Sequence, residues 1–194
     1  MSPSPLAPLL QRLSTPSRLL GEPAPTEAEL AALIEAAARV PDHGRLKPWR
    51  LIRIQGAARI ALGQALVAVR EARGETLEPA VREKDLQRFN HAPLILAVVA
   101  RITPGHKVPA VEQLLSAGAL AQNLLIGAQA LGYGAQWLTG WAAYDAEILR
   151  LLGLVEHEQL VAFIHLGTPQ AAVPDRERPR LAELLSDWTG VSRP

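Results

Sequence analysis

An uninterrupted run of apolar residues constrains the fold of this chain more than any other feature. Residues 93–100, with the sequence PLILAVVA, contain no polar side chain. A short run of this kind indicates a β-strand that is buried on both of its faces. We therefore expect a central sheet that is wrapped by helices.

Capping residues mark the start of a helix that precedes this strand. Thr26 and Glu29 have the spacing of a capping box, in which each side chain binds the main-chain N–H of the other residue. Apolar residues then recur at helical spacing, so we predict a helix over residues 26–40 that Pro41 ends.

A second helix, over residues 111–131, is the longest that the sequence predicts. It is rich in Ala, Leu and Gly, and Gly132 follows it as a C′ glycine. Its small residues favour close helix packing at a subunit interface. Polar residues such as Glu112 and Gln122 interrupt the stretch, so it predicts a buried core helix rather than a membrane span.

The remaining patterns predict an α+β sandwich with a mixed sheet, in one domain over residues 1–194. Residues 1–8 are expected to form a loose N-terminal arm, and residues 78–90 a charged, solvated helix. The other expected elements are helices at 9–13, 57–73 and 145–152 and strands at 49–54, 134–138 and 160–166.

Composition excludes several classes of protein. The chain has 20 Lys and Arg against 19 Asp and Glu, so its bulk charge does not indicate a nucleic-acid binder. It has no Cys, which excludes disulfides, thiol catalysis and cysteine-based metal sites. It also lacks the P-loop, the Rossmann glycine fingerprint and the G-x-S-x-G elbow. No targeting segment is evident, and we expect a cytoplasmic protein.

The five histidines lack the spacing of metal ligands, so we predict no metal site. His165 falls within an expected buried strand, which favours a core histidine whose nitrogens are hydrogen-bonded. His157 is expected on the surface.

Two basic clusters could bind an anion. Arg12 and Ser14 offer a forked cation and a hydroxyl donor, which together suit a phosphate. Arg176, Arg178 and Arg180 alternate near the C-terminus, so in an extended segment they would point to one side. The alternatives are a capping serine with solvated arginines and an ordinary basic tail.

Two further segments place polar and aromatic residues at strand ends, where sites are common. Residues 41–49 read PDHGRLKPW, and residues 136–141 read QWLTGW. The alternatives are a turn stiffened by two prolines and tryptophans packed in the core.

These clusters, in this order, resemble the flavin-dependent nitroreductase family, in particular its small single-domain bacterial NAD(P)H nitroreductases. The similarity runs from about residue 9 to residue 188. The segments that carry it are RLS at 12–14, SRLLGEPAP at 17–25, ARVPDHGRLKPWRL at 38–51, HKVP at 106–109, AGALAQNLLIGAQALGYGAQWLTG at 117–140 and LGTP at 166–169.

The resemblance implies an intertwined homodimer with FMN at each subunit interface. An R-x-S segment near the N-terminus would hold the flavin phosphate or ring edge, which corresponds to Arg12, Leu13 and Ser14. A basic pair near the C-terminus would contact the phosphate, which corresponds to Arg176 and Arg178.

The resemblance also implies contacts to the flavin ring. Arg39 and His43 correspond to a loop that reaches the flavin of the other subunit. Trp137, Leu138 and Thr139 correspond to a strand end that packs near the isoalloxazine.

The implied activity is electron transfer from NADH or NADPH, through FMN, to a nitroaromatic, a quinone or a similar acceptor, in a ping-pong cycle without a catalytic side chain. Lys47 stands where many relatives have Gln; near the flavin this cation would stabilise the reduced anion. The alternatives are a flavin-dependent dehydrogenase or enone reductase on an unknown metabolite, a non-catalytic flavin-binding protein and a cofactor-free interaction protein.

Overall fold

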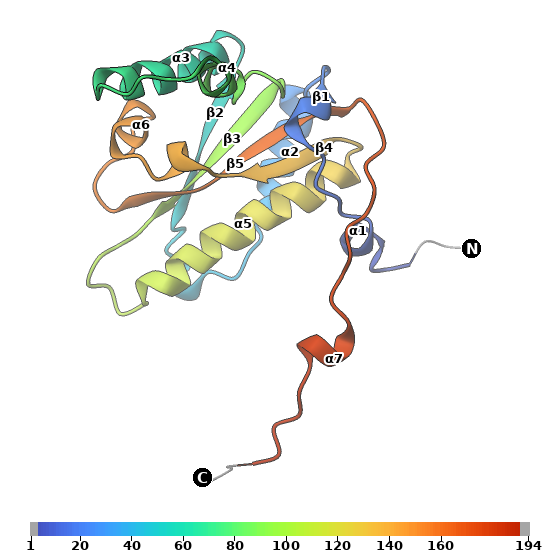
Figure 1. The fold of residues 1–194 in the computed structure, drawn as a ribbon. Coiled ribbons are helices and arrows are strands. Elements are labelled where there is room, and N and C mark those ends of the chain that lie inside the picture. The colour runs from blue at the N-terminus through green and yellow to red at the C-terminus, as the bar shows by residue number, and fades with distance from the viewer. Residues whose placement is uncertain (1–3, 191–194) are drawn as a thin grey trace.

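The apolar run forms β3, the strand Leu94–Arg101, which lies inside a five-stranded sheet (Figure 1). The computed structural model describes residues 4–190. β3 pairs with β2 (Trp49–Gln55) on one side and with β5 (Glu158–Pro169) on the other. β5 also pairs with β4 (Gly134–Leu138) and with the short β1 (Leu20–Gly21). The prediction of a strand buried on both faces is confirmed.

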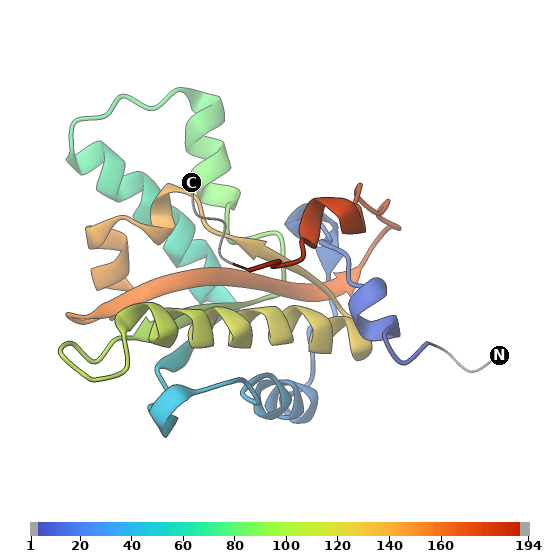
Figure 2. The same ribbon diagram turned by 90° about the horizontal axis from the view of Figure 1, so that it is seen from below.

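Helices cover both faces of the sheet. α3 (Ala57–Ala72), α4 (Pro79–Gln87) and α6 (Ala146–Leu151) lie on one face, and α2 (Glu27–Ala37) and α5 (Ala110–Ala130) on the other (Figure 1). Viewed from below, α5 runs alongside β5 (Figure 2). Two short helices, α1 (Ala7–Leu10) and α7 (Leu181–Leu184), lie near the chain ends.

The expected mixed sheet is wrong, because all four strand pairings described within residues 4–190 are antiparallel. α3 and α4 form a helical pair that returns the chain to the end of the sheet where β2 finished. Arg59, at the start of α3, accordingly donates to the carbonyls of Asn90 and Ala92, just after α4. α5 does connect two strands of the same direction, but β5 lies between them.

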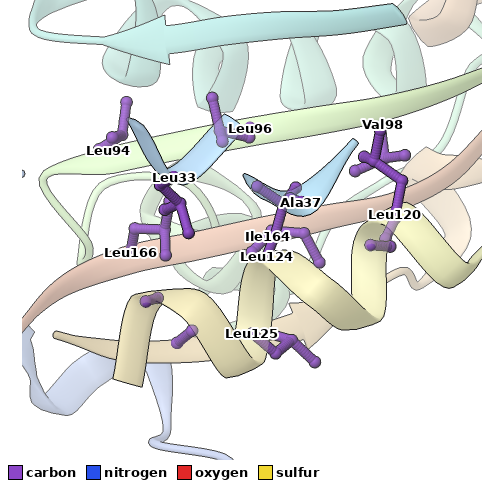
Figure 3. Close-up of a cluster of buried hydrophobic side chains, with 14 of the residues drawn as sticks. Leu33, Ala37, Leu94, Leu96, Val98, Leu120, Leu124, Leu125, Ile164 and Leu166 are labelled. Atoms are coloured by element: carbon purple, nitrogen blue, oxygen red, sulfur yellow. The ribbon is translucent and has the colours of Figure 1, made fainter. Parts of the chain in front are cut away.

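Side chains alternate along β3 and divide the core into two clusters. Leu94, Leu96 and Val98 face α2 and α5, where Leu33, Ala37, Leu120, Leu124, Ile164 and Leu166 complete the first cluster (Figure 3). Ile95, Ala97 and Val99 face the opposite side and pack with residues of α3, α6 and β5. Each cluster removes apolar surface from water, at roughly 25 cal/mol per Å².

Local signals set most element ends. The Thr26–Glu29 capping box is present at the start of α2. Gly132, with φ +87°, ends α5 in a Schellman motif, because its N–H binds the Gln129 carbonyl and the N–H of Tyr133 binds that of Ala128. Both predictions are confirmed.

Several boundaries differ from expectation, and α2 ends at Ala37 rather than directly before Pro41. α1 begins at Ala7 and carries Pro8 in its first turn, where proline is compatible with a helix, so it takes in the end of the expected arm. Residues 1–3 of that arm lie outside the described residues. β5 continues through the expected stop at 167–169, because the main chain of β1 pairs with Thr168 and Pro169.

Candidate functional site

The segment before β1 is fixed against the C-terminal end of α5. The N–H of Leu13 donates to Gln129 Oε1 at 2.8 Å, and Gln129 Nε2 donates to the carbonyl of Gln11. The N–H of Thr15 donates to the carbonyl of Ala135 in β4 at 3.1 Å. These bonds fix the main chain of the predicted R-x-S segment in one place.

The same segment lies along the open edge of β4. Ser17 N–H donates to Gln136 Oε1 at 2.6 Å. Because main-chain groups alternate along a strand, the N–H and carbonyl of Trp137 point the same way as the Ala135 carbonyl, away from β5. The edge therefore offers main-chain hydrogen-bonding groups beside the R-x-S segment.

Arginines from the two ends of the chain meet at this place. Arg12 Nη1 lies 3.3 Å from Ser14 Oγ, and Arg178 Nη2 lies 3.4 Å from the carbonyl oxygen of Arg12. Arg178 also pairs with Asp175. The hydrogen bond from Arg178, the main-chain N–H of Arg176 and the positive charge of Arg12 together hold the pKa of Asp175 below its usual range.

A shallow groove of about 290 Å³ opens beside this cluster, lined by Leu13, Gln129, Tyr133 and Val173 among others. Leu13 therefore lines the groove, and its apolar side chain does not bind a phosphate. Arg176 is exposed and offers its guanidinium to solvent, while Arg180 pairs with Glu183 at the start of α7. The three C-terminal arginines therefore have different surroundings.

Trp137, Leu138 and Thr139 do not present one surface. Trp137 packs against the first core cluster, and by the alternation of the strand Leu138 points to the opposite face of the sheet. A planar ring could therefore contact one of these two side chains together with the main chain of the strand, but not both side chains.

His43 lies at the other end of α5. Its Nδ1 is 2.7 Å from Glu112 Oε2, and Ser116 Oγ donates to the carbonyl of Pro41 at 2.6 Å. A second hollow of about 290 Å³ lies here against α5, and Leu115 and Ala119 are among the residues that line it. Arg39 is exposed and forms no ion pair within residues 4–190.

One chain does not bring all the predicted residues together. Glu112 and Gln129, which hold the two groups, are separated by about 25 Å along α5 at 1.5 Å per residue. The structure thus contains an Arg12–Ser14–Arg178 group at one end of the helix and His43 at the other; His43 and Arg39, which precedes it by four residues in the chain, are called the Arg39–His43 group below.

Apolar side chains are exposed between and beyond these groups. On α5 they are Val111, Leu114 and Leu115, the last 66% exposed, and Gly118 has open space where a side chain would lie. The segment after β5 runs away from the sheet (Figure 1). It carries exposed Leu and Trp side chains, and Trp188 is 84% exposed. Exposed apolar patches of this kind are typical of interaction surfaces.

His165 corrects one prediction. It is fully buried in β5, as expected, but neither ring nitrogen has a hydrogen-bond partner within the described part of the chain. Its ring stacks on Phe89 at a centroid distance of 6.1 Å, and burial lowers its pKa to about 3. The strand presents this residue to an apolar neighbourhood rather than to polar partners. His157 is exposed, as predicted.

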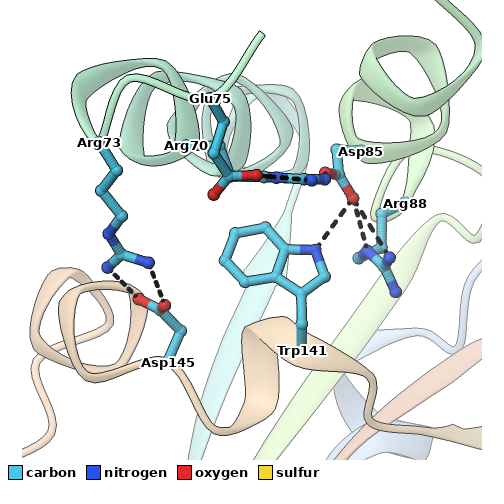
Figure 4. A network of polar contacts seen from close by, with 7 residues as sticks. All are labelled: Arg70, Arg73, Glu75, Asp85, Arg88, Trp141 and Asp145. Atoms are coloured by element: carbon cyan, nitrogen blue, oxygen red, sulfur yellow. Dashed lines mark hydrogen bonds and ion pairs between the residues drawn. The ribbon is translucent and has the colours of Figure 1, made fainter. Parts of the chain in front are cut away.

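Asp85 corrects the prediction of a charged, solvated helix over residues 78–90. The helix is α4, and the carboxylate of Asp85 is buried in it. Arg70 Nη1 donates to it at 2.8 Å, and Arg88 and Trp141 each donate at 3.2 Å (Figure 4). Burial alone would raise the pKa of Asp85, but these hydrogen bonds outweigh burial and lower it. α4 is therefore anchored to α3 and to the turn at 141–143.

Comparison with known proteins identifies the family. The sequence profile described as "Nitroreductase family" matches residues 9–168. The chain belongs to the nitroreductase family. An Escherichia coli (strain K12) protein named "Putative NAD(P)H nitroreductase YdjA" is 35% identical to it over 151 residues, which are 78% of this chain and 81% of that protein.

Solved structures share the fold of this nitroreductase-family chain. A nitroreductase-like family protein from Bacillus cereus superposes with a TM-score of 0.79 at 22% identity, covering 98% of both chains. A "putative nitroreductase in complex with fmn" from Desulfovibrio desulfuricans gives 0.74 at 25% identity, covering 96% of this chain and 98% of that one. The predictions of an α+β nitroreductase-like fold and of an enzyme of this family are confirmed.

The sequence reasoning assigned no role to two positioning residues, although Gln136 opens the candidate segment at 136–141. Gln129 and Gln136 bind the main chain of residues 11–17, yet each reads locally as a polar residue at the edge of an apolar element. Their partners are more than 100 residues away, so no local pattern reveals them.

Among residues 4–190, no helix is both long and apolar enough to cross a bilayer.

Proposed function

We propose that this chain is the subunit of a homodimeric, FMN-dependent oxidoreductase. It would transfer electrons from NADH or NADPH to a nitroaromatic, a quinone or a related acceptor. The observation that carries the proposal is the Arg12–Ser14–Arg178 group, which lies next to the open edge of β4 and beside a groove at the C-terminal end of α5. Family membership and the FMN complex of a relative agree with it.

The residues present fit the phosphate of FMN. A phosphate monoester carries nearly two negative charges. Arg12 and Arg178 offer guanidinium groups and Ser14 a hydroxyl, and Asp175 offsets only one positive charge. Arg176, whose side chain is exposed to solvent, would add a third cation. The main-chain groups of Trp137 in β4 and of Thr139 just after it suit the hydrogen-bonding edge of the flavin ring.

The Arg39–His43 group would complete the site from the partner subunit. Two copies related by a two-fold axis, packed through the exposed face of α5 in opposite directions, would bring His43 of one copy near Arg12 of the other. The exposed apolar residues of α5 and of the C-terminal segment would be covered in such a dimer.

Bound FMN would supply the redox chemistry, since it accepts two electrons from a nicotinamide donor and passes them to an acceptor. The chain's own residues would bind and orient the cofactor. Arg12 and Arg178 would hold the phosphate end, and the β4 edge the ring. Donors aimed at the ring would stabilise negative charge that develops there. No described side chain is required as a catalytic acid or base, so solvent can supply the proton.

An absorption spectrum of the purified protein tests this function. We expect a bound-flavin spectrum that bleaches on anaerobic addition of NADH or NADPH and returns when a quinone or nitroaromatic is added. A protein that binds no flavin after incubation with FMN would contradict the proposal. Bound flavin that neither donor reduces would instead support the non-catalytic flavin-binding alternative.

A further inference from the structure

The imidazole of His43 is held by a carboxylate of α5. His43 Nδ1 lies 2.7 Å from Glu112 Oε2. An ionised carboxylate only accepts hydrogen bonds, so Nδ1 carries the proton of this contact. Nε2 is then the ring nitrogen that is left for another partner.

Exposure shows that this pair does little for the stability of the fold. The side chain of His43 is 63% exposed and that of Glu112 is 44% exposed. Exposed pairs of this kind contribute little to folding. The contact therefore acts mainly on the position of the imidazole ring.

Glu112 pairs with His43 although permanent cations lie close by in the chain. Arg39 precedes His43 by four residues, Arg45 follows it by two, and Lys107 lies in the loop before α5. Among residues 4–190, the only ion pair of the Glu112 carboxylate is with His43. The geometry of the loop thus directs the histidine, rather than a nearby arginine or lysine, to this carboxylate.

Other titratable side chains of the adjacent loops are engaged elsewhere. The Asp42 carboxylate accepts two main-chain N–H groups of its own loop, at 3.0 and 2.9 Å. His106 Nδ1 accepts the N–H of Val108 at 3.0 Å. Neither side chain binds the imidazole of His43, so its orientation depends on Glu112.

The main chain that leads to this histidine is also fixed by α5. Asn123 Nδ2 donates to the carbonyl of Ala37 at 3.2 Å, and Ser116 Oγ donates to that of Pro41 at 2.6 Å. Both side chains lie on the same face of α5 as Glu112, because the three residues follow one another at spacings of four and seven. Two bonds therefore fix the loop, and Glu112 adds the orientation of one ring.

The pair stands at the edge of an open hollow. His43 and Glu112 line the hollow of about 290 Å³ described above, together with Leu115 and Ala119 of α5. In the proposed dimer this end of α5 meets the partner subunit, so the imidazole would face the partner.

We propose that Glu112 is a positioning residue of the flavin site, which binds the Nδ1–H of His43 and presents Nε2 to the FMN of the partner subunit. The inference rests on the proposed function, in which His43 reaches that flavin. A hydrogen bond at one ring nitrogen fixes the tautomer and the orientation of the other. A ring that is oriented before the cofactor binds loses less conformational entropy on binding. Glu112 thus strengthens FMN binding without touching FMN.

Titration of the flavin-free protein with FMN, followed by flavin fluorescence, tests whether the two residues act together. Glu112→Met removes the acceptor and keeps a long side chain. We expect it to weaken FMN binding about tenfold, close to the effect of His43→Ala, because a lost hydrogen bond to a charged group has this size. The double variant should bind FMN no more weakly than His43→Ala alone, since Glu112 acts only through that ring.

Glu147→Met is the matched control. Glu147 lies in the first turn of α6, as Glu112 lies in that of α5. Its side chain is 42% exposed, and it forms an exposed ion pair with Arg150. α6 covers the other face of the sheet, so FMN affinity should not change (Figure 1).

Nitrogen-15 NMR of the histidine side chains gives a readout that a general loss of structure would not produce. In the flavin-free protein at about pH 9, where histidine is neutral in water, the His43 proton should lie on Nδ1. The signal that is absent from His43→Ala assigns this residue. In Glu112→Met the proton should move to Nε2 in part or completely, while the other histidines keep their tautomers.

Wild-type FMN affinity in Glu112→Met, additive losses in the double variant, or an unchanged His43 tautomer would each overturn the inference. If the wild type binds FMN and His43→Ala weakens that binding but Glu112→Met does not, only the role of Glu112 is rejected. A wild type that binds no FMN rejects the proposed function. Wild-type affinity in His43→Ala rejects the shared site, and the role of Glu112 with it.

Discussion

At the scale of single residues, Arg12 carries the proposed flavin site. Its guanidinium lies beside Ser14 Oγ, and its carbonyl meets Arg178. We expect Arg12→Ala to weaken FMN binding by roughly 1.5–3 kcal/mol, the range for a hydrogen bond to a charged group. Titration of the apoprotein with FMN, followed by flavin fluorescence, measures the change. Unchanged affinity would reject the assignment of Arg12 to the flavin phosphate. As a control, Arg82→Ala on α4, in the helical layer on the other face of the sheet, should leave FMN affinity unchanged.

His165 yields a prediction about pH. Its pKa is about 3 when folded, against a usual value of 6.5. Between these pH values the unfolded chain binds a proton on His165 that the folded chain does not. The free energy of unfolding should therefore fall as pH falls from about 6.5 to 3, by up to about 1.4 kcal/mol per pH unit from this residue.

Urea denaturation of the wild type and of His165→Phe at several pH values tests this. The difference between their unfolding free energies should change with pH in that window and be constant above pH 7. Parallel curves throughout would show that His165 is protonated in the folded protein as easily as in the unfolded chain.

For single residues, the sequence predicts whether a side chain is buried better than it predicts which hydrogen bonds that side chain forms. A histidine inside an apolar strand is buried, which the local pattern of β5 indicates. Whether its nitrogens find partners depends on Phe89, β3 and β4, and these come from three separate parts of the chain. The Arg12–Arg178 contact joins residues near opposite ends of the chain, so only the resemblance to the family suggested it.

At the scale of elements, Gln129 couples α5 to the R-x-S segment. Both ends of its amide bind the main chain of residues 11–13. Gln129→Leu keeps the size of the side chain but removes both hydrogen bonds. We expect FMN affinity to fall about tenfold with a loss of stability near 1 kcal/mol, the net contribution of such bonds. FMN titration and urea denaturation of one sample measure both, and a loss of stability without a loss of affinity would contradict a positioning role.

The Asp85 network couples α3 and α4 to the turn at 141–143 (Figure 4). Asp85→Asn removes a buried charge that faces Arg70 and Arg88. We expect it to lower the free energy of unfolding by roughly 3 kcal/mol, as for other broken buried ion pairs. Glu75→Gln is the matched control, because Glu75 pairs with the same Arg70 but is partly exposed, and it should cost less than about 1 kcal/mol. Equal effects would mean that burial does not set the strength of this network.

Elements with local signals are the ones the sequence predicts well. β4 has the predicted bounds, and α5 differs by one residue at each end, because apolar periodicity and Gly132 set them locally. β1 has no such signal, since its two residues form a strand only through pairing with the end of β5. The antiparallel pairing of β2 with β3 likewise follows from how α3 packs on α4, which no single segment encodes.

At the scale of the whole molecule, we expect each flavin site to be shared between two subunits. The two groups of candidate residues lie at opposite ends of α5, and that helix and the C-terminal segment both carry exposed apolar residues. Sedimentation of the flavin-loaded protein should therefore give the mass of a dimer. A flavin-loaded monomer would contradict the shared site.

Complementation between two defective chains tests this claim most directly. One chain carries Arg12→Ala with Ser14→Ala, and the other Arg39→Ala with His43→Ala. Each homodimer should bind FMN weakly, because both of its sites lack one group. A heterodimer purified by two different tags should contain one intact site and one site that lacks both groups. We expect one tightly bound FMN per heterodimer, whereas a heterodimer as empty as the homodimers would show that each site is built from a single chain.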